Sequence, residues 1–182
     1  AFNHMVAELR VKARIRETFG KYIDPRIVEG LIDQPELTGV VGERRVMTVY
    51  FCDIMGFTTI SEGLTPRGLV SIINQYLTTM SVPIRQHSGI IDKYIGDAIM
   101  AVFGAPLDMP DHAVRSIRAA LEMRERLEEF NSGRKEGPTL RIRIGINSGR
   151  GVAGEMGSTN KKEYTVPGDT VNTASRLESS VA

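Results

Sequence analysis

The sequence predicts an α+β domain with a ferredoxin-like βαββαβ core. Three observations predict it: an apolar strand rich in β-branched residues, two later helices with apolar stripes, and between those helices two short strands closed by a glycine turn. A further alternating strand completes the pattern. In this split βαβ arrangement the first and third strands lie side by side at the sheet centre. The end of strand one and the turn after strand two should therefore meet at one edge.

Residues 1–43 are predicted to form a helical linker or transducing segment ahead of a domain over residues 44–182. Apolar residues at helical spacing predict a helix over about 6–19. Asp24-Pro25 is typical of the start of a second helix. The first few residues resemble an expression scar, so they are left out of the fold.

The first half of the domain is predicted to contain a strand, a helix and a hairpin. Residues 46–52 favour a strand by their β-branched and aromatic side chains, and 90–95 and 98–103 favour two strands of a hairpin. Thr65-Pro66 predicts a helix start, and Pro83 is expected to kink or end that helix. The helix is expected to bury Leu69, Ile72, Ile73, Tyr76, Leu77 and Met80.

The second half adds a helix over 108–130 and a half-buried strand over 140–146, where apolar and polar residues alternate. A glycine-rich strand and turn then lead to a short strand over 163–166 and a helix over 168–180. These glycines are expected to serve turns and close strand packing more than phosphate binding. The 108–130 helix is expected to point six residues inward: Ala113, Val114, Ile117, Leu121, Leu127 and Phe130.

Composition excludes several classes of protein. The net charge is +1 and no basic stripe gathers, so nucleic acid is not an expected partner. A single cysteine, Cys52, cannot form a disulfide within the chain, which fits a reducing compartment. No apolar run approaches the length of a membrane span. We therefore expect a cytoplasmic domain.

Two aspartates beside glycines mark the main candidate site. Asp53 ends the first strand, and Asp97 lies in the hairpin turn. Taken alone, each is better interpreted as an ordinary turn residue. Since the strand order brings them to one sheet edge, together they predict a site for Mg²⁺ and a polyphosphate. Two metal ions held by such carboxylates suit an in-line displacement at phosphorus.

Other polar residues could complete such a site. Arg176 could offset charge on a phosphate, and Asn172, four residues earlier on the same helix face, could orient a ribose or phosphate. Taken alone, Arg176 is better interpreted as a solvated helix arginine, and Asn172 could be an ordinary residue of the helix surface. Lys93 lies in an apolar strand and predicts a hydrogen bond to a ligand. Arg143 alternates outward from its strand, and a solvated face is the expected place for it.

With these residues identified, the chain resembles the class III nucleotidyl cyclases. The resemblance covers most of the chain from Arg44 onward. Four matches in family order carry it: Phe51-Cys52-Asp53-Ile54-Met55-Gly56-Phe57-Thr58, Lys93-Tyr94-Ile95-Gly96-Asp97-Ala98, Gly145-Ile146-Asn147-Ser148-Gly149 and Val171-Asn172-Thr173-Ala174-Ser175-Arg176.

The resemblance implies a role for each matched residue. Asp53 and Asp97 would bind two Mg²⁺ or Mn²⁺ ions per active site, assisted by the Ile54 carbonyl. The backbone around Gly56 and Phe57 would hold the triphosphate. Asn172 would position the ribose, and Arg176 would stabilise the reacting phosphate.

The same resemblance implies which purine is bound. Lys93 occupies the family's purine-selecting position, where lysine is associated with adenine and an acidic residue with guanine. The second selector, seven residues before Asn172, is Thr165. Many adenylate cyclases carry Asp there, and threonine resembles a bacterial subgroup that often responds to bicarbonate.

The resemblance implies an adenylate cyclase that converts ATP to 3′,5′-cyclic AMP and pyrophosphate in intracellular signalling. Its active sites would be shared between two copies in a homodimer, and a sensor or membrane module would precede residue 1. Family domains continue further and carry a triphosphate-binding lysine, so we expect the C-terminus to be truncated. A guanylate cyclase and a catalytically silent nucleotide-binding or dimerisation domain remain the alternatives.

Overall fold

The computed structural model describes residues 6, 10, 14, 20, 24–26, 42–134, 137–160 and 162–180. The chain divides into two compact units, Ala1–Val40 and Val41–Ala182. In the first, Asp24 Oδ1 accepts a hydrogen bond from the Arg26 amide at 3.0 Å, as expected of a residue that caps a helix start. Most of the predicted 6–19 helix lies outside the described residues.

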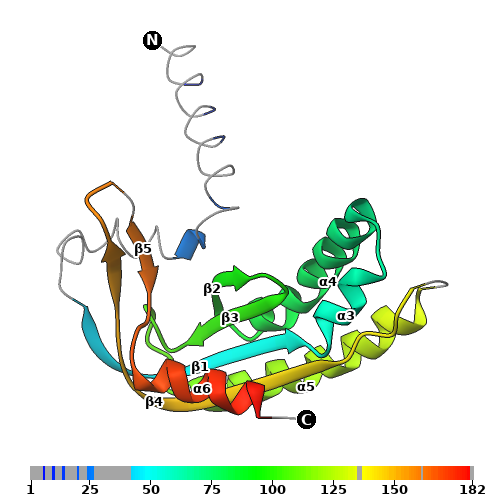
Figure 1. The fold of residues 1–182 in the computed structure, drawn as a ribbon. Helices are drawn as coiled ribbons and strands as arrows, with labels where there is room; N and C mark the ends of the chain where they lie inside the picture. Colours follow the sequence, from blue (N-terminus) through cyan, green and yellow to red (C-terminus); the bar gives the residue numbers. More distant parts are fainter. Residues whose placement is uncertain are drawn as a thin grey trace. The chain divides into compact units, whose positions relative to one another are not determined.

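The second unit contains one five-stranded antiparallel sheet with helices on both faces (Figure 1). The strand order is β2-β3-β1-β4-β5. β1 therefore lies between β3 and β4, which confirms the predicted ferredoxin-like core. The elements are β1 (Glu43–Ile54), α3 (Phe57–Glu62), α4 (Pro66–Gln86), β2 (Ile90–Ile95), β3 (Ala98–Phe103), α5 (His112–Ser132), β4 (Ile142–Gly157), β5 (Lys162–Thr165) and α6 (Asp169–Ser179).

The sheet is buried on both faces because alternate residues of β1 pack in opposite directions. Tyr50 and Cys52 belong to the large core beneath α4 and α5. Val49 and Phe51 pack on the other face, against Ala174 of α6. This double burial explains why β1 is a continuous apolar run rather than an alternating one.

The helix α4 begins as the sequence predicts, with Thr65 Oγ1 accepting from the Gly68 amide at 3.2 Å and Pro66 in the first turn. The helix does not end at Pro83, because α4 continues through it to Gln86. A proline inside a helix costs about 3 kcal/mol. Met80 and Ile84 on either side of Pro83 are fully buried, and their packing holds the helix together across it.

The inward face of α5 also differs from the prediction. Its buried residues include Ala119, Met123 and Leu127. Only the predicted Leu127 is buried, with Phe130 packed partly against the core. Three other predicted residues are about half exposed: Val114 49%, Ile117 53% and Leu121 52%. The helix is rotated so that Met123, rather than Leu121, faces the core.

The strand β4 is much longer than predicted, at 16 residues, because its first part pairs with β1 and its last part with β5. The glycines of β4 allow close packing of α6. A Cβ at Gly145 would collide with the Ala174 carbonyl and the Glu178 amide. Of the later glycines expected to serve close packing, Gly149 lies against Thr170 and Gly151 against Met47 and Val166. Across the described ranges, no helix combines the length and apolar character that a membrane crossing needs.

Candidate active site

Asp53 and Asp97 lie together at one edge of the sheet. Asp53 is the second-last residue of β1, and Asp97 occupies the turn between β2 and β3. A single backbone amide, that of Ile54, donates to Asp53 Oδ1 at 2.9 Å and to Asp97 Oδ2 at 3.2 Å. The strand order thus brings two carboxyls 44 residues apart in sequence onto one donor.

The proximity of the carboxyls changes their electrostatics. Loss of solvent, together with the hydrogen bond and the negative charge of Asp53, raises the pKa of Asp97 to about 7. Ionisation of Asp97 beside Asp53 is therefore disfavoured, and a nearby cation would offset this cost. A divalent metal with oxygen ligands would supply that compensation, so the residues present fit such an ion. Within the ranges described, no group of three or more acidic, histidine or cysteine residues forms a larger metal cluster.

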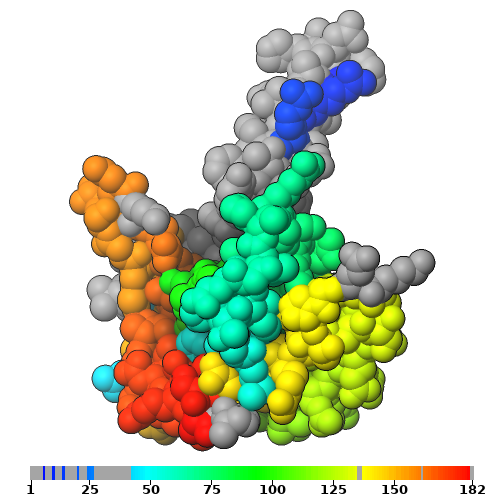
Figure 2. All heavy atoms as spheres, turned by 45° about the vertical axis from the view of Figure 1, so that its right-hand side comes forward, coloured from blue at the N-terminus to red at the C-terminus, as the bar shows by residue number. Residues whose placement is uncertain are grey.

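Arg143 is part of this site and does not lie on a solvated face as expected. Its Nη2 donates to Asp53 Oδ2 at 2.9 Å. Its Nε lies 2.9 Å from Glu178 Oε1, an ion pair whose angles do not form a hydrogen bond. The outward face of β4 is covered by α6, which places Glu178 there; Figure 2 shows the red end of α6 beside the yellow start of β4.

Two glycines form the turns next to the aspartates. Gly56 and Gly96 both have φ of +65°, in the left-handed region that glycine adopts readily. Gly56 precedes α3, and a Cβ there would meet nothing within 4 Å, so the backbone is open on that side. Phe57 begins α3 and packs its ring partly against the large core.

Lys93 and Thr165 lie in a second group, formed by β2 and β5. Lys93 Nζ is 2.9 Å from Glu163 Oε2 and 3.9 Å from Asp92 Oδ2. Thr165 Oγ1 donates to Asp92 Oδ2 at 2.6 Å. Sequence reasoning overlooked Asp92 and Glu163; the signal that could have found Asp92 is an acidic residue inside a short apolar strand.

Asn172 and Arg176 form a third group on the exposed face of α6, at the predicted four-residue spacing. The Arg176 side chain is 72% exposed, and its bonds are local, to the Asn172 carbonyl and to Thr173 and Asp169. Among the hydrogen bonds and ion pairs of the described residues, none joins this group to the carboxylate pair or to Lys93. One chain therefore presents three separate groups.

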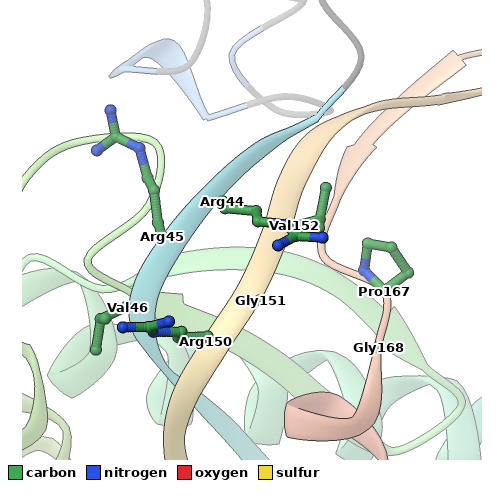
Figure 3. A pocket seen from close by; sticks show the side chains of 8 residues that line it. All are labelled: Arg44, Arg45, Val46, Arg150, Gly151, Val152, Pro167 and Gly168. Atoms are coloured by element: carbon green, nitrogen blue, oxygen red, sulfur yellow. The ribbon is translucent and has the colours of Figure 1, made fainter.

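Two hollows lie on the described part of the domain. One of about 380 Å³ is lined by residues of the β4–β5 hairpin, including Glu163 and Thr165. The other, of about 500 Å³, lies between the start of β1 and the residues before α6 and includes Arg44 and Arg150 (Figure 3). In Figure 3 Arg45 points away from Pro167. Its guanidinium forms ion pairs with Glu43 and Asp108.

The sequence was also compared with known protein families and proteins. Residues 41–182 match the sequence model of a family described as the adenylate and guanylate cyclase catalytic domain. The chain is 39% identical over 163 residues to adenylate cyclase 1 of Rhizobium meliloti, which covers 88% of the chain but only 24% of that relative.

Two solved structures are also similar. The guanylyl cyclase Cya2 has a TM-score of 0.72 and 39% identity, covering 77% of this chain and 72% of that one. The adenylyl cyclase CyaB from P. aeruginosa has a TM-score of 0.70 and 36% identity, covering 77% and 74%. In both cases the similarity extends to the sequence as well as to the fold.

Proposed function

Because the chain belongs to the family of adenylate and guanylate cyclase catalytic domains, we propose that it converts ATP to 3′,5′-cyclic AMP and pyrophosphate. The observation that carries the proposal is the pair Asp53 and Asp97 on the shared amide of Ile54. The Rhizobium relative is named an adenylate cyclase, which supports ATP as the substrate. In the reaction the ribose 3′ oxygen bonds to the α-phosphorus, its proton leaves, and the bond to pyrophosphate breaks.

Asp53, Asp97 and the Ile54 carbonyl would hold two Mg²⁺ or Mn²⁺ ions. When bound, these ions would lower the pKa of the attacking hydroxyl and neutralise charge on the phosphates. The chain's own residues bind and orient the nucleotide. The open backbone at Gly56 and Phe57 would take the triphosphate, and Arg143, already beside Asp53, would place its positive charge near the same phosphates.

Asn172 and Arg176 would act on the reacting part of the nucleotide. Asn172 would orient the ribose so that its 3′ oxygen faces the α-phosphorus. Arg176 would stabilise negative charge that develops on that phosphate. Its guanidinium is largely exposed, and its contacts with described residues all lie within its own helix, which supports a role toward a group outside its own chain.

The adenine would be bound by Lys93 and Thr165. The ammonium of Lys93 can donate to the purine N1. Thr165 Oγ1 would contact the group at the 6-position, since both residues lie beside the same carboxylate, Asp92. The similarity to Cya2, a guanylyl cyclase, keeps guanylate cyclase as a second candidate. A silent domain is less well supported, because both aspartates and Arg176 are present.

We further propose that two copies share each site. The separation of the three groups on one chain supports this, since a C₂ dimer would bring the aspartates of one copy to Lys93 and Arg176 of the other. A sensor or membrane module and a cytoplasmic location belong to the same proposal for the whole protein, of which the chain would be one part.

The first test is an assay with ATP and with GTP in the presence of Mn²⁺. We expect cyclic AMP from ATP and much less cyclic GMP from GTP. Asp53→Ala should abolish product, whereas Asp111→Ala, at an exposed aspartate just before α5, should not. Absence of both cyclic nucleotides from a dimeric wild-type protein would refute the enzyme proposal.

The shared site predicts that two inactive variants rescue each other. Mixing equal amounts of Asp53→Ala and Arg176→Ala gives heterodimers as half of all dimers, each with one of its two sites intact. About a quarter of wild-type activity should return, since one half multiplied by one half is a quarter. If heterodimers form, shown by two affinity tags, and no activity returns, each site lies within one chain.

A further inference from the structure

The group around Lys93 contains more than the two residues expected to bind the purine. Asp92, Lys93, Glu163 and Thr165 form one chain of contacts, in which Thr165 Oγ1 is 2.6 Å from Asp92 Oδ2 and Lys93 Nζ is 2.9 Å from Glu163 Oε2. The Asp92 side chain is only 5% exposed. A buried carboxylate with a short hydrogen bond to the hydroxyl of a proposed purine-binding residue requires an explanation.

The backbone explains how Asp92 reaches that position. Successive residues of a regular strand point to opposite faces. In β2, however, Ile91 pairs with Ala101 and Lys93 with Met100, so Asp92 is the extra residue of a β-bulge. Glu163 and Thr165 are two residues apart on β5 and share one side. The bulge thus lets both Asp92 and Lys93 reach that side.

The hydrogen bond fixes the direction of the Thr165 hydroxyl. A threonine hydroxyl has one proton and two lone pairs, whereas an ionised carboxylate only accepts hydrogen bonds. With Asp92 ionised, the proton of Thr165 points to Asp92, as the donor direction of their hydrogen bond has it. Toward a ligand, Thr165 Oγ1 then offers lone pairs alone. Lys93 beside it offers N–H donors alone, since an ammonium cannot accept.

We infer that Asp92 is a positioning residue that makes Thr165 a hydrogen-bond acceptor and so selects adenine over guanine. Adenine presents an N6 amino donor beside the N1 acceptor, which matches Thr165 as acceptor and Lys93 as donor. Guanine presents the O6 acceptor and an N1–H donor, the reverse pattern. This inference rests on the proposed function. It adds Asp92 as the residue that makes Thr165, whose hydroxyl can otherwise donate or accept, act as an acceptor. A hollow of about 380 Å³ adjoins Glu163 and Thr165.

The test is the ratio of kcat/KM for ATP to that for GTP. In Asp92→Asn the amide can donate to Thr165 Oγ1, which frees the hydroxyl proton to turn toward a ligand. We expect the ratio to fall about tenfold, the effect of one hydrogen bond of about 1.4 kcal/mol, through a higher KM for ATP and a gain with GTP. Asp92→Glu keeps an acceptor-only carboxylate and should restore the ratio toward wild type.

Three further variants make the test specific. Asp92→Ser also removes the acceptor-only partner, and it should shift the ratio in the same direction if Asp92→Asn folds poorly. Asp111→Asn is the same substitution at an exposed site and should leave the ratio unchanged. In a Thr165→Val background, which lacks the hydroxyl, Asp92→Asn should no longer change the ratio.

An unchanged ratio in folded Asp92→Asn overturns the inference, as does an equal shift in the Thr165→Val background. In both cases a wild type that prefers ATP leaves the proposed function standing. A wild-type protein that makes neither cyclic nucleotide overturns the proposed function and this inference together. Thermal unfolding of each variant shows whether a shift in ratio accompanies an intact fold.

Discussion

At the scale of single residues, the candidate site contains charged groups that are partly buried and paired with opposite charges. Arg143 contacts Asp53 and lies beside Glu178, whose side chain is 9% exposed. A buried acid is tolerated when a cation stands beside it, and removal of one partner leaves the other charge uncompensated. Arg143 is therefore expected to contribute to stability as well as to phosphate binding.

This dual role predicts that Arg143→Met lowers both the urea midpoint of unfolding and the activity. Arg150→Met removes an exposed arginine from the same strand and should leave the midpoint unchanged. Urea unfolding followed by circular dichroism measures the midpoint of each variant, and the cyclic nucleotide assay measures the activity. Equal midpoints for the two variants would show that the Arg143–Glu178 pair contributes nothing to stability.

The limits of sequence reasoning are also clearest in particular residues. Asp53 and Asp97 could be brought together because strand order follows from hydrophobic patterns and the βαββαβ order. The position of Arg143 could not be predicted. Alternation in the strand shows that its side chain points away from the large core, but it does not show that α6 covers that face. The Asp92–Thr165 contact depends on a bulge, which no residue pattern in β2 reveals.

At the scale of elements, α6 is held against the sheet by glycines of β4. Gly145 faces the Ala174 carbonyl, and Gly149 faces Thr170. Two residues of α6, Asn172 and Arg176, are the proposed ribose and phosphate contacts. Their position therefore depends on how closely α6 approaches β4. Sequence patterns misjudged α5 for a related reason: Val114, Ile117 and Leu121 form a second apolar stripe, and only packing decides which stripe is buried.

Gly145→Ala is predicted to displace α6. The added methyl group would overlap backbone atoms of Ala174 and Glu178, which cannot rotate away. We expect the unfolding free energy to fall by about 3 kcal/mol, the upper range for overpacking a core, together with loss of activity. Gly63→Ala is the control, because its new Cβ would lie no closer than 3.7 Å to another atom. Full stability of Gly145→Ala would contradict this packing argument.

At the scale of the whole domain, helices cover the central strand β1 on both faces. The reactivity of its cysteine, Cys52, therefore measures how well solvent is excluded from the strand. Cys52 is fully buried, and desolvation raises the pKa of its thiol to about 12. A thiolate is the reactive form, so both access and ionisation disfavour reaction in the folded state.

Iodoacetamide at mildly alkaline pH should therefore leave Cys52 unmodified in the native protein and modify it fully in strong denaturant. Mass spectrometry of the intact chain measures the difference. Because β1 is central in the sheet, the slow native rate should follow global unfolding and rise in Gly145→Ala. Rapid modification of the native wild type would show that the sheet opens locally around β1.

The shared amide of Ile54 has a consequence for how such a site can vary over evolutionary time. The group that gathers the two acids belongs to the main chain, and every amino acid except proline carries it. Substitutions at position 54 can alter the core beneath the site without removing this donor. Mutational drift is thus constrained at Asp53 and Asp97 themselves, while the contact that pairs them is inherited with the path of the backbone.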